Sequence, residues 1–92
     1  MTLRFVGIDL NIGGEGSPTV WMEEESADLL LQGEEADALL TSLVGSTEWV
    51  AGHSMGIPAN ERVIRIPAPM VPILREACDA AERAAVEHRG FR

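Results

Sequence analysis

The sequence predicts a small α+β domain: an antiparallel β-sheet of three to five strands, with a short central helix and a long C-terminal helix packed on one face. Three observations lead to this fold class. The chain has only 92 residues, the size of a single domain spanning residues 1–92. Its first third holds short β-favouring runs separated by turn residues. Its last quarter repeats apolar residues at helical spacing.

Three strands are expected in the N-terminal third. Residues 3–9 form a β-favouring run that ends at the turn residues of segment 11–16. Residues 19–24 and 28–32 are rich in β-favouring or apolar side chains and are joined by a short connection. We therefore expect these two runs to form a β-hairpin that ends at Gly33.

The spacing of apolar residues changes from that of a strand to that of a helix in the middle of the chain. Apolar residues recur there at helical spacing, namely Ala36, Leu39, Leu40 and Leu43. Acidic residues are concentrated at the start of this segment, which favours a helix N-terminus. Gly45 follows its last apolar residues, at a position where a glycine often caps the C-terminal end of a helix. The pattern predicts a short amphipathic helix over residues 34–44.

The next segment is less regular. Residues 46–60 contain several glycine and proline breaks and are expected to form a loop, with at most a brief strand at 48–51. In residues 61–66, apolar and polar side chains alternate again up to Pro67, and this pattern predicts the last strand.

Residues 70–89 predict an amphipathic helix. One stripe is apolar or small: Ile73, Leu74, Ala77, Cys78, Ala81, Ala84 and Ala85. The other side carries charges of both signs: Arg75, Asp79, Glu82, Arg83 and Glu87. Pro69 and Pro72 suit a first helical turn, whose N–H groups have no intrahelical partner.

The charge balance restricts the classes of partner. The chain has 15 acidic against 7 basic residues and a formal net charge of −8. A protein that binds nucleic acid directly, or an anionic membrane, uses an excess of basic residues, so neither is expected here. No apolar run approaches a membrane span, no signal peptide is visible, and Cys78 is the single cysteine. These features predict a cytoplasmic protein.

Ser54 is the first of two candidate catalytic residues. Segment 52–56 has the G-x-S-x-G spacing of the nucleophile elbow of serine hydrolases. In that motif a helix must follow the serine, whereas here Pro58 and a predicted strand follow it. A glycine-bounded surface loop is the preferred interpretation.

Asp9 is the second candidate. Segment 5–9 resembles the first strand of ribonuclease-H-like nucleases and actin-like ATPases, whose terminal aspartate binds a metal ion. A two-metal phosphodiesterase needs further carboxylates beside it, and the strand predicted at 61–66 supplies none. His53 and His88 also lack the spacing of metal ligands, so no catalytic residue, metal site or cofactor is predicted.

Four residues near the predicted hairpin are candidates for binding a protein partner. Glu23, Glu24 and Glu25 form an acidic run, which suits a basic partner but is also typical of a solvated hairpin tip. Trp21 precedes them on the same strand, where it serves either the core or an interface.

The order of five segments carries a family resemblance: RFVGID at 4–9, SPTVW at 17–21, DLLLQG at 28–33, VIRIPA at 63–68 and MVPILREA at 70–77. Together they resemble small acidic proteins of unknown function from filamentous high-GC soil bacteria. Genes of that group often lie near helix-turn-helix regulators, and its pattern is similar to small proteins proposed as toxin or antitoxin partners of those regulators. The resemblance implies no catalytic motif.

The leading hypothesis is therefore a non-catalytic interaction protein that binds a basic, DNA-binding regulator. Its binding surface would combine the acids at residues 23–25 with an apolar patch near Trp21 or on the last helix. A homodimer formed through sheet edges or C-terminal helices is a variant of the same hypothesis. The alternative class is a small enzyme that acts through Asp9 or Ser54.

Overall fold

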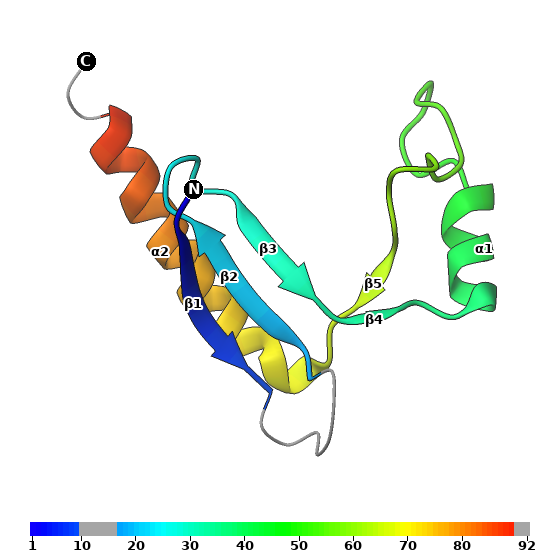
Figure 1. Ribbon diagram of the computed structural model, residues 1–92. Coiled ribbons are helices and arrows are strands. Elements are labelled where there is room, and N and C mark those ends of the chain that lie inside the picture. Colours follow the sequence, from blue (N-terminus) through cyan, green and yellow to red (C-terminus); the bar gives the residue numbers. More distant parts are fainter. Residues whose placement is uncertain (10–16, 90–92) are drawn as a thin grey trace. The chain divides into compact units, whose positions relative to one another are not determined.

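A computed structural model describes residues 1–9 and 17–89 (Figure 1). The turn expected at 11–16 lies outside these residues. The chain divides into two compact units, which we call the sheet unit (Met1–Gly33 with Ile66–Arg92) and the insert (Glu34–Arg65). The predicted α+β class is confirmed. The five strands, however, belong to two separate sheets, one in each unit.

The sheet unit contains an antiparallel sheet of three strands in the order β1-β2-β3. The strands are β1 (Leu3–Ile8), β2 (Thr19–Glu23) and β3 (Leu29–Gln32). Each agrees with its predicted run to within one residue at either end. The register of β1 against β2 shifts between Phe5 and Gly7, which marks a bulge in the edge strand.

One long helix covers one face of this sheet (Figure 1). A single 3-10 turn, η1 (Ala68–Met70), leads into α2 (Val71–Arg89). Val20, Met70 and Ala77 form the fully buried centre between helix and sheet. Partly buried side chains surround them: Val6, Leu29, Ile66, Ile73 and Leu74.

The apolar stripe predicted for α2 agrees with the buried or partly buried residues except that it included Cys78, which is exposed, and omitted Ala80, which is buried. Ala77 and Ala80 are buried, while the Cys78 side chain is exposed. Residues three or four positions apart share a helix face, so the buried face runs from Ile73 through Ala77 to Ala80. Cys78 lies one position, or about 100°, away from Ala77 and is turned out of that face.

The insert consists of a two-stranded sheet, a helix and a loop. β4 (Glu34–Glu35) pairs with β5 (Ile64–Arg65), and α1 (Ala38–Ser46) follows β4. The predicted loop at 46–60 is confirmed, whereas the brief strand considered at 48–51 does not form. The strand predicted at 61–66 shortens to its two paired residues.

The central helix starts later than predicted, and it continues through Gly45, the expected C-terminal cap, to end at Ser46 with Thr47 as the cap. Residues 34–35 are paired with β5, and the N–H of Ala36 still donates to the carbonyl oxygen of Val63 at 2.9 Å. Asp37 then caps the helix, because its Oδ1 accepts the N–H of Leu40 at 2.9 Å. The acids that suggested a first helical turn therefore belong to a strand, and the capping aspartate sets the helix start.

None of the helices in the described part of the chain is both long and apolar enough to cross a bilayer.

Candidate partner-binding surface

The turn between β2 and β3 carries the three predicted glutamates. We call residues 23–28 the acidic turn. The N–H of Ala27 donates to the carbonyl oxygen of Glu23, and the N–H of Glu23 donates to that of Asp28, both at 2.8 Å. Ala27 has a φ of 64°, a left-handed conformation that costs free energy for a residue with a Cβ and that closes this turn tightly.

Hydrogen bonds from the N-terminus also hold the acidic turn. The N–H of Glu24 donates to the carbonyl oxygen of Thr2 at 2.9 Å, and the N–H of Thr2 donates to Oε1 of Glu25 at 2.8 Å. This second bond stabilises the carboxylate and lowers the pKa of Glu25 below its ordinary value. Ser26 Oγ donates to Oε1 of Glu23 at 2.6 Å. The turn therefore holds at least two of its carboxylates in defined positions.

An apolar row crosses the sheet on the face away from α2. In the sheet register, Phe5 lies opposite Trp21, and Trp21 lies opposite Leu30. Val20 and Met22, the neighbours of Trp21, are buried, so strand alternation turns Trp21 away from the α2 side. Phe5 is 58% exposed and Leu30 is 38% exposed, while Trp21 is half-buried between them.

Leu3 extends this row toward the acidic turn. It is 48% exposed and lies opposite Glu23 in the register. We define the open face as the four residues Leu3, Phe5, Trp21 and Leu30. Within the sheet unit, no described element covers this face, as Figure 1 shows. An apolar surface beside an acidic rim is typical of a protein interaction site.

A pocket of about 390 Å³ lies on the α2 side of the hairpin, beside the acidic turn. Six residues line it: Arg4, Met22, Glu24, Glu25, Ala84 and Glu87. Three of these side chains are carboxylates and one is a guanidinium, so the acidic character continues around this end of the sheet.

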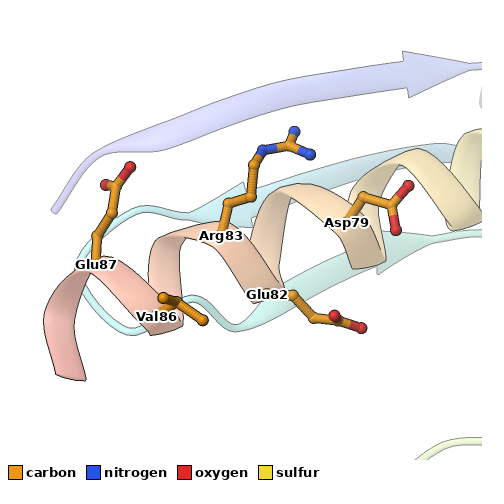
Figure 2. A pocket seen from close by; sticks show the side chains of 5 residues that line it. All are labelled: Asp79, Glu82, Arg83, Val86 and Glu87. Carbon is orange, nitrogen blue, oxygen red and sulfur yellow. The ribbon is translucent and has the colours of Figure 1, made fainter. Parts of the chain in front are cut away.

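The C-terminal helix was the other predicted location for an apolar patch. A shallow groove of about 460 Å³ runs along it, lined by Asp79, Glu82, Arg83, Val86 and Glu87. Figure 2 shows that Arg83 and Glu87 project to one side of α2 and Glu82 to the other. Val86 is the single apolar side chain among four charged ones. The apolar patch therefore lies on the sheet and not in this groove.

Asp9 lies at the end of β1 and is buried. Its N–H donates to the carbonyl oxygen of Pro18 at 2.9 Å, which continues the β1–β2 ladder. Among the side chains described in residues 1–9 and 17–87, no three from histidine, cysteine or acidic residues come close enough to hold a metal ion.

Ser54 lies in the exposed loop of the insert. Gly52 and Gly56 flank it with φ values of 81° and 98°, and His53 Nδ1 lies 3.0 Å from the carbonyl oxygen of Ser54. No helix starts after the serine before η1. The strand–serine–helix arrangement of a nucleophile elbow is therefore missing around this residue.

Comparison of the chain with protein-family models, curated proteins and solved structures finds no match. The candidate surface therefore has to be judged from its own residues.

Sequence reasoning proposed Trp21 and the three glutamates as binding residues but did not include Leu3, Phe5 and Leu30, which are exposed beside them. A signal for Leu30 was present in the run 29–31, because three consecutive leucines on a strand cannot all face one side. Phe5 required the sheet register, which the sequence does not display.

Proposed function

We propose that this protein is a non-catalytic cytoplasmic interaction protein that binds the basic surface of a DNA-binding transcriptional regulator. The observation that supports this best is the position of the acidic turn directly beside the open face. A turn held by hydrogen bonds presents negative charge, and the adjoining sheet presents apolar area that water covers in the free protein.

The two parts of the surface make different contributions to binding. The glutamates attract a cationic surface over a distance, which speeds encounter and depends on ionic strength. The open face supplies the apolar contact that slows dissociation. A regulator whose DNA-binding residues are covered in this way cannot bind phosphates at the same time, so the protein competes with DNA.

The likeness to small proteins encoded near helix-turn-helix regulators supports the same class of partner. A toxin–antitoxin-like pair fits this proposal, with the present chain as the acidic member. The net charge of −8 adds to the attraction toward any basic regulator.

The first experiment is affinity purification of the tagged chain from its host cells at low and at moderate salt, with identification of what co-purifies. We expect a basic DNA-binding protein that is lost as the salt concentration rises. Recovery of the chain alone, or only of a second copy of it, would contradict the proposal.

Charge reversal then tests the acidic turn in the purified complex. Lysine at Glu23, Glu24 and Glu25 should weaken binding at low salt by at least about tenfold. The matched control reverses three exposed acids of α2, Glu76, Asp79 and Glu82, which changes the net charge equally. Equal losses in the two variants would mean that only the overall charge matters and that the acidic turn is not the site.

A further inference from the structure

The dimensions of the open face match a single helix. Three strands span two interstrand spacings, about 10 Å, which is close to the diameter of an α-helix. Five residues of strand extend for about 17 Å, which corresponds to about 11 residues of helix. A helix of three turns would therefore cover the face completely.

The opposite face of the same sheet already uses this arrangement. α2 lies over β1, β2 and β3, and its side chains bury Val20 and Met22. A second helix on the open face would complete a three-layer stack, which is a common way to cover both faces of a sheet. An added strand would instead pair at an edge and would leave Phe5 and Trp21 exposed.

The acidic side chain beside the open face lies at one end of the three strands. Glu23 lies opposite Leu3 at the end next to the acidic turn. At the other end of the three strands, Ile8, Thr19 and Gln32 are all uncharged. An occupant with complementary charge therefore needs its basic residues at one end and none at the other.

We propose that the open face docks an amphipathic helix of the partner, with an apolar stripe over Phe5, Trp21 and Leu30 and with lysine or arginine residues gathered at the end above the acidic turn. This inference rests on the proposed function and adds the type and orientation of the docking element. The stripe would repeat at positions i, i+3, i+4 and i+7, as in other helices that bind apolar surfaces.

Site-specific photo-crosslinking tests the proposal in the full chain inside its host cells. p-Benzoylphenylalanine is introduced in place of Phe5, in place of Glu23, which lies opposite Leu3, and in place of Val86 as a control on the exposed side of α2. Mass spectrometry then maps the crosslinked peptide of the partner. We expect Phe5 and Glu23 to mark the apolar middle and the basic end of one helical segment, and Val86 to give no crosslink to that segment.

Two results would overturn the docking inference while leaving the proposed function intact. One is a crosslink to a regulator from position 23 with none from position 5. The other is a crosslink from position 5 to a segment without the apolar stripe. A lack of partner crosslinks from both positions, or crosslinks only to a second copy of the chain, would contradict the proposed function as well.

Affinity provides a second measurement on the complex. Phe5→Ser should raise the Kd by at least about tenfold, because truncation of an aromatic anchor costs more than other contacts. Val86→Ser, which truncates a side chain of comparable exposure on α2, should change it by less than about twofold. Thermal unfolding of both variants checks that they fold. Equal effects of the two substitutions would overturn the inference.

Discussion

The sheet unit and the insert are built from the same chain but are stabilised in different ways. The sheet unit buries Val20, Met22, Met70, Ala77 and Ala80 between a sheet and a helix. In the insert, Ala36 is the single hydrophobic residue that is buried, and α1 buries none of its residues. The sheet unit thus depends on packing, while the insert depends on local hydrogen bonds.

Side-chain hydrogen bonds hold the insert. Asp37 caps α1, Thr41 Oγ1 donates to the carbonyl oxygen of Ala36, and the Trp49 indole N–H donates to that of Val44 at 2.9 Å. The ion pair between Arg62 and Glu35 is exposed and adds little. A unit of this size falls below the length that usually folds alone, so the insert should open locally before the sheet unit unfolds.

The largest expected contrast comes from two methionines. Met70 is fully buried, so Met70→Ala should lower the free energy of unfolding by about 2–5 kcal/mol. Met55 in the insert is 55% exposed, and Met55→Ala should change it by less than about 0.5 kcal/mol. Urea denaturation followed by circular dichroism measures both. Similar losses at the two positions would remove the distinction between the units.

Substitution of alanine for two different glycines should change the stability of the protein in opposite directions. A Cβ at Gly7 would lie 2.8 Å from Cγ2 of Ile73, a branched side chain that moves little, so Gly7→Ala should destabilise by about 1–3 kcal/mol. Gly45 lies within α1, and a Cβ added there would lie 3.7 Å from Cδ1 of Ile57, which is an ordinary contact distance. Gly45→Ala should therefore stabilise the protein by about 0.5–1 kcal/mol. The same denaturation assay applies, and a loss at Gly45 would show that α1 packs more tightly than the structure indicates.

The cap of α1 gives a test confined to the insert. Asp37→Ala removes the acceptor for the Leu40 N–H and should cost about 1 kcal/mol. Amide hydrogen exchange should speed up in α1 and stay unchanged in β2. Asp37→Asn, which keeps an acceptor oxygen, serves as the control. Faster exchange in both units would mean that they unfold together.

The smallest expected effect is the pH dependence at Glu25. Its pKa is lowered in the folded state by the Thr2 N–H, so the bond stabilises the fold above the ordinary pKa of 4.5. That contribution is lost as the pH falls through the lowered value. An NMR titration should place the midpoint of Glu25 below its ordinary value, and Glu25→Gln should slightly flatten the loss of stability in acid. A midpoint at or above the ordinary value would show that the bond is not formed.

Sequence patterns predicted the sheet unit well because its signals are local. The hairpin and α2 follow from runs of β-favouring residues and from the spacing of Ile73 and Ala77. The insert was harder, because Glu34 and Glu35 have the composition of a helix start but pair with Ile64 and Arg65 about thirty residues away. The alternation of residues 61–66 indicated a strand, but nothing in the sequence of residues 34–35 indicated that they pair with it.

The candidate surface was predictable in part. The glutamates and Trp21 stand out by charge and size, and the structure places them at neighbouring positions of one hairpin. The open face as a whole depends on which residues of β1 and β3 lie opposite Trp21, and that register is fixed by packing of α2 on the other face.

The two tryptophans give each unit its own optical reporter. The chain has two tryptophans and no tyrosine, and one tryptophan lies in each unit. Trp49 is 66% exposed, so its fluorescence should be red-shifted and readily quenched by iodide, while the half-buried Trp21 should be more protected. In Trp49→Phe the remaining emission comes from the open face, so a blue shift on adding a candidate partner would signal occupation of that face. In Trp21→Phe the emission follows the insert alone.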